Sequence, residues 1–288
     1  MKYLITGGAG FIGGHLVKRL IRGGDTIEIV DDMSVGKFLG IAPKNILDDI
    51  GATFREVDVV FHLAAFTRPR ESVKNPKKTF EVNVEGTRNV LDYCLEHEVK
   101  RVVFTSSAAV YGSQSKYPTR EDADLNPESP YAVSKCRGEE LCREYGKKGL
   151  EFNIVRPFNV YGKGQDPSGP YGAAVPKFID RLERGKRPYI TGDGKQFRDF
   201  VYIDDIVELL IRASKSAVHG EVFNGGSGKS TTINDLYRLI CKLMSRSTRP
   251  EHIEEIVEPM TRADIAKAEE MLGWVPKYSL EEGLRRTI

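Results

Sequence analysis

"TGGAGFIGG", residues 6–14, places three glycines at intervals of three: Gly7, Gly10 and Gly13. An apolar run typical of a strand precedes the stretch at 2–6, and a helical pattern follows it at 15–23. Glycines at a first strand-to-helix turn allow a tight turn, a close approach of a pyrophosphate, and close packing of the helix on the sheet. Backbone N–H groups at the helix start would then meet phosphate oxygens. We therefore predict a dinucleotide site at this turn.

A second strand candidate, "TIEIVDD" (26–32), ends in two acidic residues, Asp31 and Asp32. A carboxylate at the end of the second strand can accept hydrogen bonds from both hydroxyls of a ribose. Its negative charge would repel a phosphate on the 2′ position. Asp31 at this distance from the glycine turn therefore predicts NAD rather than NADP.

Short apolar runs alternate with amphipathic stretches through the first half of the chain. Further strands are expected at 57–65, 101–107 and 152–162, and helices at 79–97, from 129 onward and near 232–244. This alternation predicts an α/β fold with a doubly wound parallel sheet. A loop rich in Gly and Pro follows at 162–172. We predict a dinucleotide-binding domain over 1–162 and a smaller C-terminal α/β domain over 163–288 that mainly binds substrate, with some segments returning to the first domain.

The composition is that of an ordinary globular protein and excludes several classes. Of the 288 residues, 40% are hydrophobic and 29% are charged, and the net charge of +2 gives no electrostatic case for nucleic acid. No apolar stretch is long enough to span a bilayer, and the start does not resemble a signal peptide. The four cysteines are scattered, and the five histidines have no ligand spacing. We expect free thiols, a cytoplasmic protein and no metal site.

The stretch "HLAA" (62–65) ends the apolar run at 57–65. Ala64 and Ala65 are small enough to let a dinucleotide pass close to the backbone. A histidine in such a place is more often a satisfied core residue than a catalyst, and we interpret His62 in that way.

The stretch "TSSAAVYG" (105–112) follows a further strand, at the sheet edge where ligands of doubly wound sheets bind. Ser106 and Ser107 can cap or satisfy a strand end. Beside a reactive tyrosine, one of these hydroxyls can also share a substrate proton.

The stretch "SPYAVSK" (129–135) begins the next helix. Ser129 is a good N-cap and Pro130 a good first helical residue, so Tyr131 and Lys135 should share a helix face. A nearby ammonium and the positive helix start both stabilise a phenolate, which a tyrosine needs in order to act as a base at neutral pH. The spacing alone arises by chance, but in this context we predict a proton-transfer pair.

One stretch imitates a phosphate loop. "GGSGKST" (225–231) lies between a strand and a helix, but the Walker pattern needs a glycine five places before Gly228, where this chain has Phe223. We therefore reject a nucleotide-hydrolysing function.

Taken together, these stretches resemble the extended short-chain dehydrogenase/reductase superfamily, and within it the NAD-dependent nucleotide-sugar epimerases of the UDP-glucose 4-epimerase type. The resemblance also includes "NVEGTRNVL", "RPFNVYG", "GDGKQFRDFVYIDD" and the C-terminal "ADIAKAEEMLGWVPKYSLEEGL". It implies a Rossmann domain, a UDP-sugar substrate, a homodimer, and catalysis by Ser107, Tyr131 and Lys135.

The resemblance further implies two sets of binding residues. The NAD contacts are Gly7, Gly10, Phe11, Ile12, Gly13, Asp31, Asp32, Asp49, Ile50, Leu63, Ala64, Ala65, Asn83, Ser106, Tyr131, Lys135 and Pro157. The substrate contacts are Thr67, Ser107, Ala108, Tyr131, Asn159, Val175, Tyr189, Thr191 and Arg198. Asn159 and Arg198 match positions that hold the diphosphate, for which a planar guanidinium is suited.

The residues before "VYG" favour one subfamily. Related dehydratases and UDP-glucuronate decarboxylases carry a carboxyl group there, whereas this chain has Ala108 and Ala109. The implied reaction is 4-epimerisation by transient oxidation to a 4-keto sugar, with NAD regenerated. Alternatives are a UDP-GlcNAc or UDP-glucuronate 4-epimerase, a 4-ketoreductase, a decarboxylase, or a non-catalytic NAD-binding protein.

Three stretches depart from the family pattern. The segment 32–58 is short, and only "LDDI" (47–50) remains as a candidate adenine contact. The segment 257–268 lacks the Arg-x-Gly-Asp loop that grips the diphosphate. Thr191 replaces the aromatic residue that stacks on uracil, with Tyr189 nearby.

Overall fold

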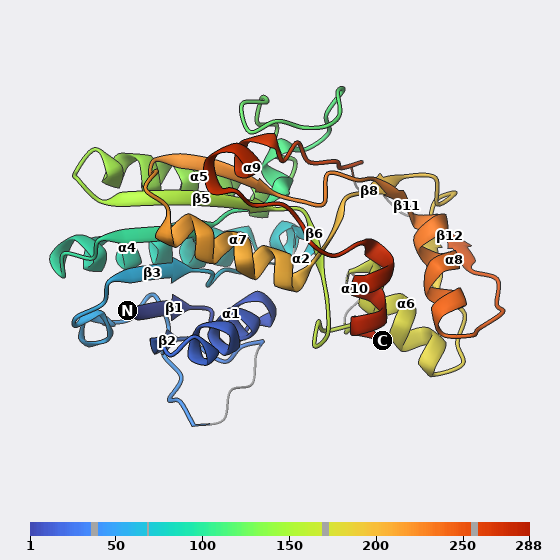
Figure 1. Cartoon of the computed structure of the whole chain (residues 1–288), viewed down its shortest axis with the longest axis horizontal. Coiled ribbons are helices and arrows are strands. Elements are labelled where there is room, and N and C mark those ends of the chain that lie inside the picture. The colour runs from blue at the N-terminus through green and yellow to red at the C-terminus, as the bar shows by residue number, and fades with distance from the viewer. Residues whose placement is uncertain (36–39, 68, 169–172, 255–258) are drawn as a thin grey trace.

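A six-stranded sheet forms the centre of the computed structural model, which describes residues 1–35, 40–67, 69–168, 173–254 and 259–288. The strand order is β10-β5-β4-β3-β1-β2, and all neighbours are parallel (Figure 1). The strands are β1 (Lys2–Thr6), β2 (Thr26–Val30), β3 (Val59–His62), β4 (Arg101–Thr105), β5 (Glu151–Pro157) and β10 (Glu221–Gly225). The predicted doubly wound parallel sheet is confirmed. Its order reverses between β1 and β3, which is where such sheets bind ligands.

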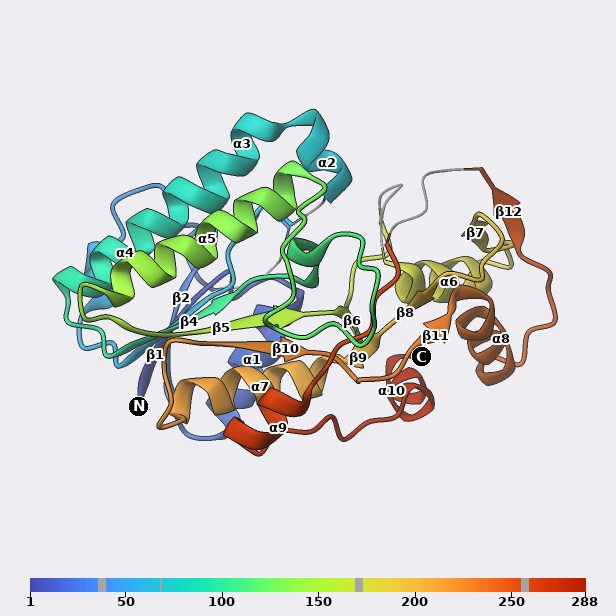
Figure 2. The ribbon, with the colours of Figure 1, turned by 90° about the horizontal axis from the view of Figure 1, so that it is seen from above.

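Helices cover both faces of the sheet. Figure 2 shows α3 (Pro76–Phe80), α4 (Gly86–Glu96) and α5 (Pro130–Gly146) on one face, and α1 (Phe11–Arg22), α7 (Ile203–Lys215) and α9 (Ala266–Leu272) on the other. Alternate strand residues supply the two larger hydrophobic clusters: Tyr3 and Ile5 face one, and Leu4 faces the other. Because both faces are covered, the strands are apolar almost throughout.

Three expected elements differ from the structure. The expected helix at 15–23 begins earlier, at Phe11, because Gly10 is its N-cap. Gly13 lies in the first helical turn, where it packs closely against the backbone of Gly7 and Gly8. The expected strand at 152–162 is two strands, since after Pro157 the chain leaves the sheet and β6 (Asn159–Tyr161) pairs with β9 (Phe200–Tyr202) instead.

The expected helix at 79–97 is likewise interrupted. A π-helical turn, Glu81–Glu85, separates α3 from α4. Such turns add one residue to the helical repeat and change the direction of the side chains they carry. Asn83 lies in this turn.

The remaining elements gather at one end of the sheet (Figure 2). They are α6 (Ala174–Glu183), α8 (Ile233–Leu243), α10 (Leu280–Thr287) and the short pairs β7 (Tyr189–Thr191) with β12 (Glu251–Ile253) and β8 (Phe197–Arg198) with β11 (Thr231–Thr232). The short helix α2 (Pro69–Lys74) lies apart from them, beside α3 and α5 (Figure 2). Residues 169–172 of the Gly/Pro loop and residues 257–258 of the short C-terminal segment lie outside the described ranges. No helix in the described ranges is both long and apolar enough to cross a membrane.

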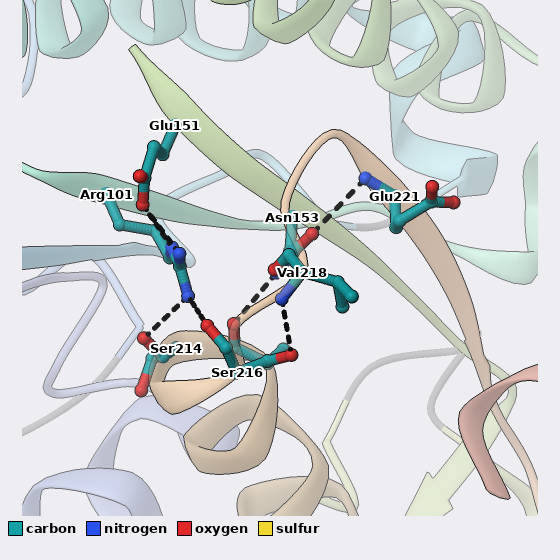
Figure 3. Close-up of polar contacts among 8 residues, drawn as sticks. Arg101, Glu151, Asn153, Ser214, Ser216, Val218 and Glu221 are labelled. Atoms are coloured by element: carbon teal, nitrogen blue, oxygen red, sulfur yellow. Dashed lines mark hydrogen bonds and ion pairs between the residues drawn. The ribbon is translucent and has the colours of Figure 1, made fainter. Parts of the chain in front are cut away.

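In the C-terminal half of the chain, α7 packs on the sheet and β10 joins it. Polar contacts between β4, β5 and the segment that connects α7 to β10 hold these elements together (Figure 3). Arg101, at the start of β4, donates to the carboxylate of Glu151 and to the carbonyl oxygens of Ser214 and Ser216 at the end of α7. Asn153 of β5 donates to the carbonyl oxygen of Val218 at 2.9 Å. The positive charge of Arg101 lies at the C-terminus of α7, where a cation is favourable, so the contacts of Arg101 stabilise α7 against the sheet.

Candidate functional site

The predicted glycine turn joins β1 to α1. Gly7 has φ +73°, and a Cβ atom there would lie 2.7 Å from the backbone nitrogen of Ala64. A Cβ atom on Gly13 would lie 2.1 Å from the carbonyl oxygen of Gly7. Gly10 caps α1 without a side chain, and the first turn holds no acidic residue. The positive start of α1 therefore suits an anion such as a pyrophosphate.

Asp31 stabilises this turn from the end of β2. Its carboxylate accepts hydrogen bonds from the backbone nitrogens of Ala9 (2.9 Å) and Met33 (2.8 Å), one on each oxygen. Each carboxylate oxygen can accept a second bond, so the group can still receive ribose hydroxyls. Asp32 is exposed and accepts from the nitrogen of Ser34.

Tyr131 and Lys135 lie one turn apart on the buried side of α5. Ser129 caps the helix as predicted, accepting from the nitrogen of Ala132 at 3.1 Å. Tyr131 is 8% exposed and Lys135 is 4% exposed, so the two side chains share the face that is turned toward the sheet. The Lys135 ammonium donates to the carbonyl oxygen of Thr105 at 2.8 Å and lies 5.1 Å from the ring centre of Phe104.

The electrostatics of this pair differ from the expectation. Burial raises the pKa of Tyr131, and the hydrogen bond with Ser107 opposes the rise without reversing it. Burial also lowers the pKa of Lys135 to about 8. The physical reason is that both groups lose water on the same helix face, and the ammonium is directed to Thr105 rather than to the phenol. The side chains of the protein alone therefore do not lower the pKa of Tyr131 below its ordinary value.

Ser107 follows β4 and caps the short 3-10 turn Ala108–Tyr111. Its hydroxyl oxygen accepts from the nitrogen of Ala109 at 3.2 Å, so its proton can be donated elsewhere. The preceding Ser106 has a different role, since its hydroxyl donates to Glu139 at 2.7 Å. The structure thus brings Ser107 to Tyr131 and directs Ser106 into the protein.

Two polar residues that support the site, Ser72 and Ser134, were not found from the sequence, and both connect to the predicted Asn83 or Tyr131. Ser72 of α2 accepts from the nitrogen of Tyr131 at 3.0 Å. Ser134 donates to the carbonyl oxygen of Tyr131 at 2.7 Å and accepts from Asn83 at 2.9 Å. Asn83, aimed by the π turn, also accepts from the nitrogen of Phe66 at 2.7 Å. Only Ser134 had a local signal, because it lies inside "SPYAVSK".

His62 is the satisfied core histidine that we expected. It is 1% exposed, and its Nδ1 lies 2.6 Å from the Thr6 hydroxyl and its Nε2 lies 2.9 Å from the Thr87 hydroxyl. Thr87 donates its own proton to the carbonyl oxygen of Asn83, so Nε2 must be the donor to Thr87. Burial lowers the pKa of His62 to about 3, so the ring is neutral and its Nδ1 accepts from Thr6.

This burial predicts a pH dependence of stability. Between about pH 3 and pH 6.5 the unfolded chain binds a proton at His62 that the folded protein does not bind. The neutral, buried His62 therefore makes its full contribution to the free energy of unfolding above pH 6.5. Below that pH the contribution falls by about 1.4 kcal/mol per pH unit.

We expect the free energy of unfolding, measured with urea, to decrease between pH 7 and pH 5.5 by about 1 kcal/mol less in His62→Gln than in the wild type. His219→Gln, at an exposed position, is the control and should keep the wild-type slope. An unchanged slope in His62→Gln would contradict the assignment.

Asn159 and Arg198, the predicted diphosphate residues, are joined through Asp199. The side chain of Asn159 donates to the carbonyl oxygen of Asp199 (3.1 Å) and to the hydroxyl of Thr261 (2.9 Å). Arg198 is 7% exposed and donates to the carbonyl oxygen of Phe197. Their role toward a diphosphate stays a prediction.

The other predicted substrate residues are more scattered. Val175 is 1% exposed in the hydrophobic core, so only its backbone can meet a ligand. Tyr189 is 44% exposed and stacks under the guanidinium of Arg181 at 3.8 Å, and Thr191 pairs with Ile253. Thr67 is exposed, and Ala108 packs partly against a small hydrophobic cluster. These assignments stay predictions.

The candidate adenine residues already make contacts within the chain. The carboxylate of Asp49 accepts from the nitrogen of Gly51 (3.1 Å) and from the hydroxyl of Tyr93 (3.0 Å), and Ile50 is 2% exposed in the core. The remaining predicted cofactor positions, Phe11, Ile12, Leu63, Ala65 and Pro157, lie on α1 or at or just beyond the carboxyl ends of β3 and β5.

The stretch that imitates a phosphate loop binds a carboxylate of the chain itself. The nitrogens of Ser227 (2.6 Å) and Gly228 (3.0 Å) and the Ser227 hydroxyl (2.6 Å) donate to the buried carboxylate of Asp199. Ala263 adds a fourth donor at 3.0 Å. The amide groups that would hold a phosphate in a Walker loop are thus used inside the protein, which agrees with our rejection of that function.

The residues around the glycine turn fit NAD. The uncapped start of α1 suits the pyrophosphate, and Asp31 retains capacity for ribose hydroxyls. Beside Lys135, the Thr105 hydroxyl is buried and has no hydrogen-bond partner among the described residues. Buried polar atoms are rarely left unpaired, so a polar group of a ligand suits this place.

Comparison with known proteins gives consistent results. Residues 3–226 match the model of the NAD dependent epimerase/dehydratase family. The UDP-glucose 4-epimerase of Mycolicibacterium smegmatis is 36% identical, over 100% of this chain and 97% of that protein. The UDP-N-acetyl-alpha-D-glucosaminuronate decarboxylase of Bacillus cytotoxicus is also 36% identical, over 99% of this chain and 96% of that protein. The crystal structure of the Thermotoga maritima UDP-glucose 4-epimerase with UDP-glucose has a TM-score of 0.95 at 35% identity, covering 100% of this chain and 97% of that one.

Proposed function

The chain belongs to the NAD-dependent epimerase/dehydratase family, and from that premise we propose that it is a UDP-sugar 4-epimerase of the UDP-glucose/UDP-galactose type. The observation that carries the proposal is the grouping of Ser107, Tyr131 and Lys135 at the carboxyl edge of the sheet. The adjacent positions 108 and 109 are alanines, whereas the related dehydratases and decarboxylases described above carry a carboxyl group there.

NAD, when bound, supplies an acceptor for the hydride of the sugar C4 and returns that hydride. The residues of the chain handle the proton. Tyr131 takes the proton of the sugar 4-hydroxyl through its phenolic oxygen, and Ser107 shares that hydrogen bond. Because burial raises the pKa of Tyr131, the base needs positive charge nearby. Lys135 supplies an ammonium on the same helix face, and a cationic nicotinamide would add to it.

Lys135 has a second task in this proposal, which is to hold the nicotinamide ribose. Asn159 and Arg198 hold the diphosphate of the substrate, since a guanidinium pairs well with phosphate oxygens. The sugar must turn about this anchored diphosphate in order to receive hydride on its other face.

Epimerisation is favoured over elimination or decarboxylation by Ala108 and Ala109. Neither residue can protonate or deprotonate a sugar carbon, and a 4-epimerase needs no such group. The 36% identity to a decarboxylase makes loss of CO₂ the alternative that the experiment must include.

The experiment is a panel of UDP-sugars, including UDP-galactose, UDP-GlcNAc and UDP-glucuronate, incubated without added NAD. We expect UDP-galactose to be converted to UDP-glucose, with no net NADH and no CO₂, because the cofactor is regenerated on the enzyme. A protein that carries NAD and leaves every UDP-hexose unchanged would rule out the epimerase. Release of CO₂ from a UDP-hexuronate would assign the decarboxylase instead.

The homodimer and the cytoplasmic location also stay proposals. Light scattering of the purified protein measures the first directly. A mass of twice 32.2 kDa is expected.

A further inference from the structure

Glu139 is a buried ionisable group that the proposed reaction does not use. It lies on α5 one turn beyond Lys135 and is 0% exposed. Its carboxylate accepts from Ser106 (2.7 Å), from Arg156 through Nε (2.8 Å) and Nη2 (2.7 Å), and from Arg143 (3.2 Å). Both oxygens are therefore fully satisfied.

The network continues from Arg156 across the protein. Arg156 donates to the hydroxyl of Tyr111 at 2.8 Å, and Tyr111 donates to the side-chain oxygen of Asn224 at 2.7 Å. Asn224 then donates to the carbonyl oxygens of Thr119 (3.0 Å) and Asp264 (3.1 Å). An arginine can only donate, so each later bond has one possible direction. These hydrogen bonds connect α5, which carries Tyr131 and Lys135, with Thr119 and Asp264, which lie near the predicted diphosphate residues.

Stability alone does not explain this network. A buried ion pair gains little over well-packed apolar residues, because the loss of hydration offsets the attraction. A fully satisfied network does, however, fix the positions of the groups that it contacts. One of these groups is Ser106, which directly precedes Ser107, and another is the helix that carries Tyr131 and Lys135.

The charge of Glu139 also acts on Lys135. Burial lowers the pKa of Lys135 to about 8, and negative charge opposes that shift. Of the groups near the ammonium, His62 on β3 is neutral, Tyr131 is a phenol, and burial keeps the pKa of the Cys142 thiol far above its ordinary value. Glu139 remains as the anion, since its pKa is lowered: burial alone would raise it, but Arg156 and Ser106 outweigh that effect.

We propose that Glu139 is a positioning residue: paired with Arg156, it holds the strand end that carries Ser107 against Tyr131, and it supplies the negative charge that keeps Lys135 an ammonium. This role rests on the proposed function, and it assigns a task to a residue that is 0% exposed and whose carboxylate bonds to side chains of the protein.

The test compares Glu139→Gln with the wild type by steady-state kinetics on the best UDP-sugar. We expect kcat to fall roughly tenfold or more while KM and NAD content stay near wild type, and the alkaline limb of the kcat profile to move about one pH unit lower. Glu144→Gln is the matched control, since Glu144 lies on the same helix, has a side chain that is 44% exposed, and pairs with Arg137. It should leave kcat and the pH profile unchanged.

Glu139→Asp distinguishes the effect of the negative charge from the effect of its position. It also replaces Glu139→Gln as the test variant if Glu139→Gln does not fold. It keeps the negative charge but is one methylene shorter, so kcat should fall with the alkaline limb unmoved. A folded Glu139 variant of either kind with wild-type kcat overturns the positioning role.

A spectroscopic readout keeps this proposal distinct from the proposed function. The protein is labelled with ¹³Cε-lysine, and the Lys135 signal is identified by its loss in Lys135→Arg. The titration midpoint should lie lower in Glu139→Gln than in the wild type. If the wild type converts no UDP-sugar, the epimerase proposal fails, yet this midpoint still decides the electrostatic role. Equal midpoints overturn it.

Discussion

Tyr131→Phe is expected to lower turnover of a UDP-sugar by about 10² to 10⁴-fold while NAD content stays at the wild-type level. The change removes only the phenolic oxygen, which the proposed reaction uses to take the sugar proton. The backbone bonds of Tyr131 to Ser72 and Ser134 do not depend on that oxygen, so α5 should stay in place. The measurement is kcat together with the NAD released from the denatured protein.

Tyr145→Phe is the matched control for this change. Tyr145 lies on the same helix and is 3% exposed, and its hydroxyl bonds to Asp92 away from the predicted site. The loss of that bond should cost about 1 kcal/mol of stability and leave turnover near wild type. If Tyr131→Phe also turns over within a few-fold of wild type, Tyr131 is not the base.

Gly13→Ala is expected to abolish stable NAD binding. The new Cβ atom would lie 2.1 Å from the carbonyl oxygen of Gly7 and 2.9 Å from the Cα of Gly8, and both are backbone atoms that cannot rotate away. The turn must open, which moves the start of α1 from the pyrophosphate. An overpacking cost of about 3 kcal/mol corresponds to a loss of roughly a hundredfold or more in affinity. Calorimetric titration with NAD, after bound NAD has been removed from both proteins, measures the difference in affinity.

The neighbouring glycine provides the control. A Cβ atom on Gly14 would meet only the carbonyl oxygen of Gly8 at 3.8 Å, an ordinary contact. Gly14→Ala should therefore keep NAD binding, and it should stabilise α1 by about 1 kcal/mol through helix propensity. Wild-type NAD affinity in Gly13→Ala would show that the turn does not hold the cofactor.

Local spacing was enough to predict much of this protein. The strands at 2–6, 101–105 and the first part of 152–162 follow from short apolar runs. The cap at Ser129 and the shared face of Tyr131 and Lys135 follow from capping chemistry and from the helical period of 3.6 residues. The glycine turn is also local, because Gly7 and Gly13 contact each other across six residues. His62 could be interpreted as a core residue from its apolar surroundings alone.

Some features had no local signal. The chain leaves the sheet after Pro157, because Asn159 finds its partner at Asp199, 40 residues away. The π turn that aims Asn83 depends on contacts with Phe66 and Ser134. Asp199 occupies the loop that resembles a phosphate site only because β8 and β11 pair.

The amino-acid order by itself therefore predicted the parallel sheet, from the alternation of strands and helices along the chain. It also predicted the glycine turn and the shared helix face of Tyr131 and Lys135, since each of these depends on neighbours within about two helical turns. Tertiary structure alone decided the electrostatics. Ser106 meets Glu139 across 33 residues, and Tyr111 meets Asn224 across 113. The charge on a buried side chain depends on how much water packing removes and on which ion packing brings near, and neither quantity is encoded in short-range spacing.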